Sequence, residues 1–495
     1  MQIGDLMKRS GVQFGTSGAR GLVEAMTDQV CHAYTTAFLG YLQKADMIEP
    51  GAEVGIAGDL RSSTPRIMIA CARAVRDVGC RPCYLGRIPS PATAAWGMAR
   101  GAPSLMVTGS HIPDDRNGIK FNLPTGEILK RDEEAIRVQP LRIAEELFDR
   151  SGSFVRDESA MLPDEDPTAY RDYLDRYLRF FPPGCLTGLR VAVYEHSSVA
   201  RAAYVDVLEG LGARVTRLGH SDVFVPVDTE AIRPEDIALA LDWARTSRFD
   251  ALISADGDGD RPLIGDETGR WMRGDTAGIL CARELGARAV VTPVSSNTAL
   301  ERCGWFETVL RTRIGSPYVI EGMQQLVDGG LSEVVGYEAN GGFLLATDIE
   351  REGRALAALP TRDAVVVAIA ILRAAVGQKR PISALAASLP RRFTHSDRLK
   401  DFPTEVARAR LAELHSGDPP RDKAAIEAVF GPRFGHVAAL DVTDGLRITF
   451  ASGDIAHLRP SGNAPELRAY AEADSPERAA ALSRDCMEIL ERWRS

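Results

Sequence analysis

Residues 53–86 read EVGIAGDLRSSTPRIMIACARAVRDVGCRPCYLG, and this stretch decides the fold. A short apolar run predicts a buried strand, and a polar turn with Ser62 and Ser63 follows it. Apolar residues then recur at helical spacing before a second strand. Strand–helix–strand units of this kind build parallel sheets that helices cover on both faces. The stretch therefore predicts an α/β domain.

Two later stretches repeat this order of elements, again with a Ser-Ser pair at the turn. They are LRVAVYEHSSVARAAYVDVLEGLGARVTRLG (residues 189–219) and ARAVVTPVSSNTALERCGWFETVLRTRIG (residues 287–315). Three related units favour three similar α/β domains with mixed, mainly parallel sheets; chance similarity among common strand–helix–strand patterns is the alternative. Residues 445–473 instead alternate apolar and polar positions around a glycine-rich turn and lead into a helix. This tail predicts a smaller C-terminal α+β domain.

Changes in composition suggest where these domains meet. A polar, acidic and proline-bearing segment surrounds residue 155, a turn lies near 270, and SLPRRFTHSDRL lies near 390. We therefore expect four domains, at residues 1–155, 156–270, 271–390 and 391–495.

The composition of the chain argues against nucleic-acid and membrane partners. The net charge is −9, and lysine and arginine are spread along the chain rather than gathered on one face, as a nucleic-acid binder requires. No apolar run approaches the ~20 residues of a membrane span, and the N-terminus lacks the apolar core of a secretory signal. We expect a cytoplasmic protein with no nucleic-acid or membrane partner.

Cysteine spacing does not indicate a metal centre. Among the eight cysteines, Cys80 and Cys83 form a single CxxC pair with no second pair and no histidine nearby. A zinc site needs four ligands, or three with an open position. We therefore interpret the cysteines as buried or surface thiols rather than as metal ligands.

The first candidate for chemistry is TGSHIPDDRNGIKF, residues 108–121, which follows the apolar run SLMV. The run predicts a strand that delivers Ser110 to the carboxyl edge of an α/β sheet, where ligands bind. His111 is adjacent, and the DDRNG turn can fold Lys120 back toward both. An ordinary turn or helix-cap serine is the alternative.

The second candidate is an acidic loop, in which Asp256, Asp258 and Asp260 are separated only by glycine. Two carboxylates about 4 Å apart repel by about 4 kcal/mol at an effective dielectric of about 20, so the three need a cation or full solvation. Oxygen ligands favour Mg²⁺. An EF-hand is excluded because Arg261 occupies the position that requires glycine, and Pro262 follows it.

A third loop, RPSGNAPELR, suits a phosphate group. The turn has backbone amides that can form an anion nest, and its arginines, hydroxyl and amide can bind phosphate oxygens. An ordinary Pro-Gly turn is the alternative. The candidate residues are Arg459, Ser461, Gly462, Asn463 and Arg468.

Two further polar loops complete the set. Glu338 and Asn340 follow a predicted strand in GYEANGG, and a carboxylate with an amide can bind sugar hydroxyls. Arg20 lies in FGTSGARG, which we expect to be a glycine-rich loop near the N-terminus.

These five loops, in this order, resemble the α-D-phosphohexomutase superfamily, the group of phosphoglucomutases and phosphomannomutases. The resemblance covers essentially the whole chain and implies three similar α/β domains and a distinct fourth around a central cleft. It implies interconversion of hexose 1-phosphate and hexose 6-phosphate, with mannose as the expected sugar and glucose as a second. It also implies Mg²⁺ and a hexose 1,6-bisphosphate that serves as intermediate and activator.

The resemblance also implies the residue roles. Ser110 would carry the phosphoryl group and bind the metal together with Asp256, Asp258 and Asp260. His111 or Lys120 would move the proton of the substrate hydroxyl. Arg20 would be a further catalytic residue that supports the transferring phosphate. The remaining residues would bind the substrate: Arg261 its phosphate charge, Glu338 and Asn340 the ring hydroxyls, and Arg459, Ser461, Gly462, Asn463 and Arg468 the other phosphate.

Four positions depart from the frequent pattern of the family. Ile112 stands where many members have asparagine, Gly342 where many have histidine, and Asn463 and Glu466 where threonine and lysine are frequent. A phosphoglucosamine mutase, a metal-dependent sugar phosphatase and a non-catalytic sugar-phosphate sensor are the alternatives. The sequence leaves open the preferred hexose, the phosphorylation state of Ser110, and a monomer or homodimer.

Overall fold

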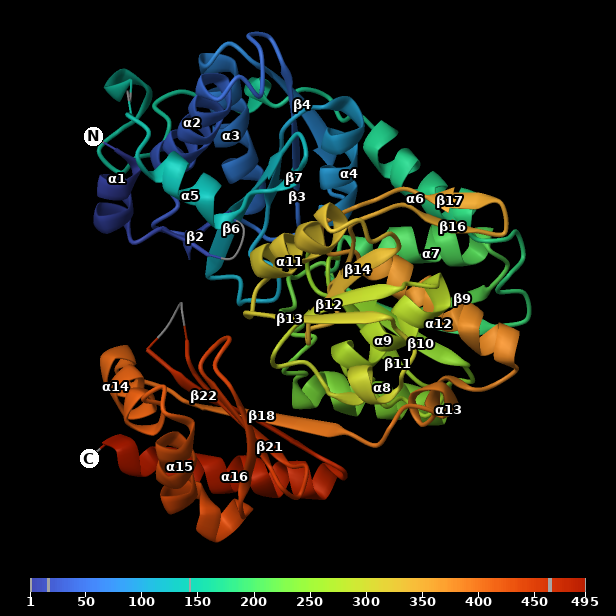
Figure 1. Cartoon of the computed structure of the whole chain (residues 1–495). Helices are drawn as coiled ribbons and strands as arrows, with labels where there is room; N and C mark the ends of the chain where they lie inside the picture. The colour runs from blue at the N-terminus through green and yellow to red at the C-terminus, as the bar shows by residue number, and fades with distance from the viewer. Residues whose placement is uncertain (1, 16–17, 142–143, 462–464, 495) are drawn as a thin grey trace.

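The computed structural model describes residues 2–15, 18–141, 144–461 and 465–494. Over these ranges the chain forms four large sheets that follow one another along the sequence, and helices pack on them (Figure 1). Each sheet lies within one of the four predicted ranges. The domain bounds near 155, 270 and 390 stay a prediction.

The first sheet has the strand order β1-β2-β6-β5-β3-β4, with β7 beside β6. Its strands β3, β4 and β5 are parallel, and β6 turns back antiparallel to β5. The strands are β1 Gln13–Phe14, β2 Gly18–Leu22, β3 Glu53–Gly58, β4 Arg81–Gly86, β5 Ser104–Val107, β6 Arg116–Leu123 and β7 Gly126–Glu127. The helices are α1 Ile3–Ser10, α2 Asp28–Lys44, α3 Thr64–Asp77, α4 Ser90–Arg100 and α5 Lys130–Arg137.

The second and third sheets have four strands each, in the orders β11-β10-β8-β9 and β13-β12-β14-β15. The second contains β8 Arg190–His196, β9 Arg214–His220, β10 Ala251–Ala255 and β11 Pro262–Gly265, with helices α6 Thr168–Phe180, α7 Ala200–Gly210 and α8 Pro234–Thr246. The third contains β12 Ala289–Pro293, β13 Thr308–Thr312, β14 Val334–Tyr337 and β15 Phe343–Leu345, with helices α9 Gly274–Leu285, α10 Ala299–Arg302 and α11 Ser316–Asp328. A small hairpin, β16 Ile349–Arg351 and β17 Arg354–Leu356, then leads to α12 Ala364–Gln378 and α13 Ile382–Ala386.

The predicted repeat of strand, helix and strand is confirmed in all three units. The strand pairs β3–β4, β8–β9 and β12–β13 are parallel, and a helix connects each pair. Parallel neighbours need a crossover connection, which the amphipathic segment after each Ser-Ser turn supplies.

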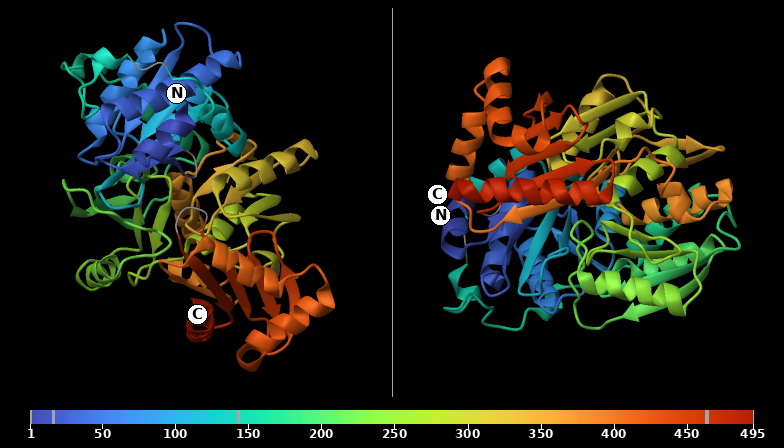
Figure 2. Two further views of the ribbon diagram at one scale, coloured as in Figure 1. Left: turned by 90° about the vertical axis from the view of Figure 1, so that its left-hand side faces the viewer. Right: turned by 90° about the horizontal axis from the view of Figure 1, so that it is seen from below.

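The last sheet is antiparallel throughout, in the order β18-β22-β21-β20-β19, which confirms the predicted α+β tail. Its strands are β18 Phe393–Leu399, β19 Val437–Asp441, β20 Leu446–Phe450, β21 Ile455–Pro460 and β22 Leu467–Ala473. Its helices are α14 Thr404–Leu414, α15 Pro419–Phe434 and α16 Pro476–Glu491; Figure 2 shows α16 lying along the sheet. Short 3-10 turns occur at Glu145–Leu147, Ser159–Met161 and Arg492–Arg494.

One hydrophobic core joins the first three units. It runs from Trp96 on α4 through Tyr173 on α6 and Tyr204 on α7 to Ile369 on α12. Helix α12 is apolar from Ala364 to Leu372, as expected of a helix that other elements enclose, and Asp363 caps its N-terminus. These units therefore form one packed body.

The C-terminal domain has a core of its own, around Phe402, Phe430 and Leu482. A buried ion pair between Arg392 and Glu472, 2.6 Å long, lies where it meets the third unit. Figures 1 and 2 show this domain beside the packed body, with β21 and β22 directed toward it. In the part of the chain that the structure describes, no helix is long and apolar enough to span a bilayer.

Candidate active site

Ser110 lies on the sharp loop that joins β5 to β6. The two strands are antiparallel, with Met106 opposite Lys120, so the predicted fold-back of Lys120 toward the serine is confirmed. Ser110 is 1% exposed and has a φ of 56°, in the left-handed region that non-glycine residues rarely adopt. Such strain persists only where the surroundings enforce it, and it clusters at functional sites.

Arg61 provides that enforcement, and the sequence analysis missed it. Its guanidinium donates to the backbone carbonyls of Ser110 (2.9 Å), Ile112 (2.5 Å) and Pro113 (2.7 Å) and pairs with Asp59 at 3.1 Å. Asp59 in turn accepts hydrogen bonds from the Thr108 hydroxyl and the Gly109 amide of the same loop. Asp59 and Arg61, two charged residues directly after a predicted buried strand, were the signal in the sequence that could have indicated this role.

We expect Arg61→Met to destabilise the fold. The substitution removes five donated hydrogen bonds, four to backbone carbonyls and one to Asp59. It leaves the carboxylate of Asp59 buried without its cation, which costs about 3–5 kcal/mol. Urea unfolding followed by circular dichroism measures the change. Arg81→Met is the matched control, since Arg81 is exposed and its pair with Glu53 spans 3.5 Å, so it should shift stability by less than about 0.5 kcal/mol. Equal effects of the two variants would contradict this role for Arg61.

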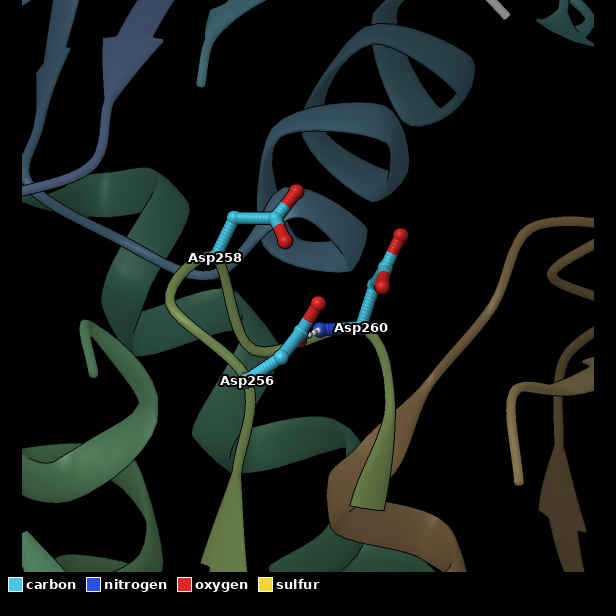
Figure 3. A group of neighbouring side chains, drawn as sticks. All are labelled: Asp256, Asp258 and Asp260. Carbon is cyan, nitrogen blue, oxygen red and sulfur yellow. Dashed lines mark hydrogen bonds between the residues drawn. The ribbon is translucent and has the colours of Figure 1, made fainter. Parts of the chain in front are cut away.

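The acidic loop lies against the serine. Asp256, Asp258 and Asp260 occupy the turn between β10 and β11, and Figure 3 shows their side chains projecting to the same side of it. One carboxylate oxygen of each lies within 4.8 Å of the others. The Ser110 hydroxyl donates to Asp256 Oδ2 at 2.6 Å. Two loops separated by more than a hundred residues therefore meet at one point.

The surroundings shift the pKa values of Asp256 and Asp260 in opposite directions. Burial, together with repulsion from Asp258 and Asp260, raises the pKa of Asp256 well above its usual value. Burial acts in the same direction on Asp260, but Arg362 and Lys120 outweigh it and lower the pKa of that carboxyl. Lys120 Nζ lies 2.5 Å from Asp258 Oδ2 and 2.6 Å from Asp260 Oδ2.

The cluster fits a divalent cation. The Oδ1 atoms of Asp258 and Asp260 are buried and accept no hydrogen bond from the residues that the structure describes. Buried carboxylate oxygens without donors are costly, and a hard cation satisfies them. The Ser110 hydroxyl, 2.6 Å from Asp256 Oδ2, adjoins this cluster, and its part in metal binding stays a prediction.

His111 is held by two other loops. Arg261 Nη1 lies 2.8 Å from His111 Nδ1, the Ser110 hydroxyl lies 3.2 Å from the same nitrogen, and Asp228 lies 4.0 Å from Nε2. Burial, together with Arg261 and Arg20, lowers the pKa of His111 to about 3, so the imidazole is neutral at pH 7. Because Arg261 only donates, Nδ1 is the accepting nitrogen. Asp228 lies in a loop that the sequence analysis did not single out.

Arg20 lies on strand β2 rather than in a loop, which corrects the expectation for the N-terminal motif. Its position opposite Gly118, with Gly18 opposite Lys120, puts both cations on the same face of the sheet. Burial, followed by repulsion from Arg261, lowers the pKa of Arg20 to about 10, so it stays charged.

A cavity of about 30 Å³ lies beside Ser110. Its lining includes Ser110 and four cations, namely Arg20, Lys120, Arg261 and Arg362. Such a concentration of positive charge around one hydroxyl suits an anionic group. Arg362 belongs to none of the five loops that the sequence analysis recognised.

The predicted sugar loop follows β14, as expected. Glu338 and Asn340 are 5% and 8% exposed. Glu338 faces Arg362 across 3.4 Å, whereas the Asn340 side-chain oxygen accepts a bond of 2.9 Å from the Gly342 amide. Glu338 therefore adjoins the charged centre, and the oxygen of Asn340 shapes its own loop.

The described residues of the predicted phosphate loop do not line the Ser110 cavity. Arg459 and Arg468 are on strands β21 and β22, opposite each other, and not in the turn as expected. Ser461, 6% exposed, begins the turn, and Gly462 and Asn463 lie outside the described residues. No described residue of the C-terminal domain lines the cavity. Asp444 holds Arg459 at 2.8 Å.

Comparisons with known proteins show the family of the chain. Three parts of the chain match models described as phosphoglucomutase/phosphomannomutase: alpha/beta/alpha domain I (residues 11–145), alpha/beta/alpha domain III (273–393) and the C-terminal domain (407–489). A phosphomannomutase of Sinorhizobium fredii is 44% identical over 480 residues, which cover 97% of this chain and 99% of the relative. A phosphomannomutase of Salmonella muenchen is 44% identical over 476 residues, covering 96% and 95%.

More distant relatives share the architecture. A phosphoglucosamine mutase of Mesorhizobium japonicum is 27% identical over 507 residues, covering 98% of this chain and 99% of the relative. The crystal structure of a phosphoglucomutase/phosphomannomutase family protein from Burkholderia thailandensis superposes with a TM-score of 0.72 at 19% identity, over 97% of each chain. The chain thus belongs to the phosphoglucomutase/phosphomannomutase family of the α-D-phosphohexomutase superfamily, and it is a phosphohexomutase, an isomerase.

Proposed function

We propose that this phosphohexomutase interconverts mannose 1-phosphate and mannose 6-phosphate, and accepts glucose phosphates as a second substrate. The two relatives that are 44% identical are both named phosphomannomutase, and the phosphoglucosamine mutases are more distant. We further propose a phosphoserine at Ser110 and a hexose 1,6-bisphosphate that is both intermediate and activator.

One observation carries this proposal. The Ser110 hydroxyl donates to Asp256 at 2.6 Å, and Ser110 lines a cavity together with four cations. A phosphoryl group on serine carries about −1.5 to −2 charges at pH 7, and the sugar phosphate carries a similar charge. Without gathered cations, these two anions would repel each other.

The proposed reaction has two phosphoryl transfers. In the first, the bond between phosphorus and Ser110 Oγ breaks and a bond to the free hexose hydroxyl forms, giving the bisphosphate. The bisphosphate turns over, and its other phosphoryl group then passes to Ser110 Oγ, leaving a hydroxyl on the sugar. The cations Arg20, Lys120 and Arg261 offset the charge on the group in transit.

The hydroxyl proton needs an acceptor near Ser110. His111 lies beside the serine with Nδ1 as its accepting nitrogen, so in this role it would take the proton at Nδ1 once Arg261 moves from that nitrogen to the phosphoryl group. Burial acts to lower the pKa of Lys120, but Asp258 and Asp260 outweigh it and raise that pKa, so Lys120 is protonated and suited to donate. We propose these two residues as the proton-transfer pair.

Asp256, Asp258 and Asp260, with the group on Ser110, would hold Mg²⁺. When bound, the ion supplies Lewis-acid stabilisation of phosphoryl oxygens. The chain itself contributes the fixed geometry of the three carboxylates. The short glycine turn maintains this geometry, and the backbone amides of Asp260 and Arg261 donate hydrogen bonds to Asp256 Oδ1.

The C-terminal arginines are proposed to hold the phosphate that is not reacting. They do not line the Ser110 cavity, so the phosphate that they would hold lies at a distance from Ser110, as the non-reacting end of a bisphosphate does.

We expect Arg459→Ala to raise the Michaelis constant for hexose phosphate by about 10- to 100-fold with little change in kcat, because one charge-assisted phosphate contact is lost. Initial rates over a range of substrate concentrations test this. Arg478→Ala is a suitable control, since Arg478 pairs with Asp454 at 2.8 Å in the same domain and away from the turn. An unchanged Michaelis constant would reject the proposed phosphate grip.

A substrate panel tests the function as a whole. The 1-phosphates of mannose, glucose and N-acetylglucosamine would be supplied with Mg²⁺ and a trace of the matching bisphosphate. We expect the highest kcat/KM for mannose, then glucose. Preference for N-acetylglucosamine would make the chain a phosphoglucosamine mutase, and free phosphate as the sole product would make it a phosphatase. A cytoplasmic location, a monomer or homodimer, and the four domain bounds belong to the same proposal.

A further inference from the structure

Arg362 is a buried cation at the junction of three loops. It lies between β17 and α12 and is 2% exposed. Its Nε lies 3.0 Å from Asp260 Oδ2, and its Nη1 lies 3.4 Å from Glu338 Oε2. Its side chain also lines the cavity of Ser110. One guanidinium therefore contacts the acidic loop and the sugar loop and faces the nucleophile.

The chain neighbours of Arg362 are both anchored. The Thr361 hydroxyl donates to Glu127 on β7 at 2.5 Å, which ties this segment to the first domain. Asp363 accepts hydrogen bonds from Tyr173 and Tyr177 on α6, and it also caps α12. With the residues on both sides fixed, the backbone of Arg362 is preorganised, so the side chain reaches the cavity in one defined place.

Gly342 provides the space for this side chain. A Cβ atom at Gly342 would lie 2.5 Å from Arg362 Cδ and 2.6 Å from Arg362 Cγ, closer than real Cβ contacts allow. Gly342 is not among the residues with positive φ, whereas its neighbour Gly341 has a φ of 90°. The backbone conformation therefore does not require glycine at 342; the packing of Arg362 does. A side chain at this position would occupy the volume that Arg362 fills.

The charge balance in the cavity indicates what Arg362 binds. Lys120 is shared between Asp258 and Asp260, and Arg261 is bonded to His111. Arg362 touches two carboxylates, but its Nε forms no hydrogen bond of acceptable geometry with any described residue. A planar guanidinium can bind a phosphoryl group while one edge stays paired to carboxylate.

We propose that Arg362 is a further substrate-binding residue, whose guanidinium contacts the phosphoryl group in transit at Ser110, and that Gly342 is the position that admits it. The inference rests on the proposed phosphoryl transfer and deepens it. The rival role is purely positional, in which Arg362 only holds the sugar loop through Glu338.

The two roles predict different kinetic signatures. If Arg362 contacts the moving phosphoryl group, Arg362→Ala lowers kcat by about 100- to 1,000-fold and changes the Michaelis constant by less than about 3-fold. Millimolar guanidinium, but not the same concentration of sodium chloride, then restores part of the rate. If the role is only positional, Arg362→Ala behaves like Glu338→Gln, with a raised Michaelis constant and little loss of kcat, and the proposal is wrong.

A double-mutant cycle tests the role of Gly342. Gly342→Ala alone should lower kcat by about 10-fold or more, because the added methyl group displaces Arg362. In the Arg362→Ala background the same change should cost less than about 2-fold, since the side chain that it would meet is gone. Independent effects of the two substitutions would overturn the proposed pairing.

Two controls keep the test specific. Arg373 on α12 also pairs with two carboxylates, Glu284 at 3.0 Å and Glu352 at 2.6 Å, so Arg373→Ala removes a comparable ion pair away from the cavity and should keep kcat within about 2-fold. The wild-type mutase assay is run in parallel. Absence of mutase activity in the wild type defeats the proposed function, whereas an active wild type with an active Arg362→Ala variant defeats only this inference.

Discussion

Replacing Ser110 by alanine should abolish hexose phosphate interconversion, with a fall in kcat of at least about 10⁴-fold, because the atom that carries the phosphoryl group is removed. The fold should remain, since the substitution removes one hydroxyl and its bond to Asp256, worth about 1 kcal/mol. A coupled assay of 6-phosphate formation measures the rate. Transfer of radiolabelled phosphate from the bisphosphate to the protein measures the covalent step.

Ser62→Ala is the matched control. Ser62 belongs to the Ser-Ser turn of the first repeat, and its hydroxyl donates to Asp114 at 3.2 Å on an exposed surface. This variant should keep both its activity and its labelling. Full mutase activity in Ser110→Ala would discard the phosphoserine mechanism, whatever the thermal stability of the variant.

Neutralising one carboxylate of the acidic loop should be nearly as damaging. Asp258→Asn removes a buried carboxylate whose Oδ1 accepts no hydrogen bond from the described residues and is therefore placed to bind a cation. We expect a loss of about 10³-fold in kcat/KM at saturating Mg²⁺. Chelation of the wild type should abolish its activity, and added Mg²⁺ should restore it.

A readout independent of turnover accompanies this prediction. A ligand that binds only the folded state raises the melting temperature, so Mg²⁺ should stabilise the wild type and leave Asp258→Asn unaffected. Asp222→Asn serves as control, because Asp222 is exposed and lies outside the acidic loop. An equal Mg²⁺-dependent shift in Asp258→Asn and the wild type would place the metal elsewhere.

Local sequence patterns were sufficient to predict the helices and strands and the loops that hold the candidate site residues. The three strand–helix–strand units, the antiparallel tail, and the strands that precede Ser110, Asp256 and Glu338 all follow from periodicity and from turn residues. The pattern gave the wrong local structure for Arg20 and Arg459. Glycines and prolines nearby suggested loops, whereas Arg20 lies on a strand whose partner β6 is distant in sequence, and Arg459 pairs with Arg468 across the β21–β22 hairpin.

Partners distant in sequence explain the residues that were missed. Arg61 is buried because carbonyl groups of the Ser110 loop surround its guanidinium, and no periodicity near residue 61 encodes that contact. Arg362 precedes an apolar helix in a segment without any phosphate-binding pattern. Its role depends on Asp260, on Glu338 and on the space left by Gly342.

The sequence by itself determined the fold class, the order of the α/β units and the antiparallel tail, and which loops hold the candidate site residues, since these depend on residues that are close along the chain. Only the tertiary structure decided that Ser110 contacts Asp256, that His111 contacts Arg261, and that Arg362 lines the same cavity as the other three cations. The physical reason is that burial and Coulomb interactions depend on distance in space, and a chain that packs three domains around one core brings together charges that the sequence keeps far apart.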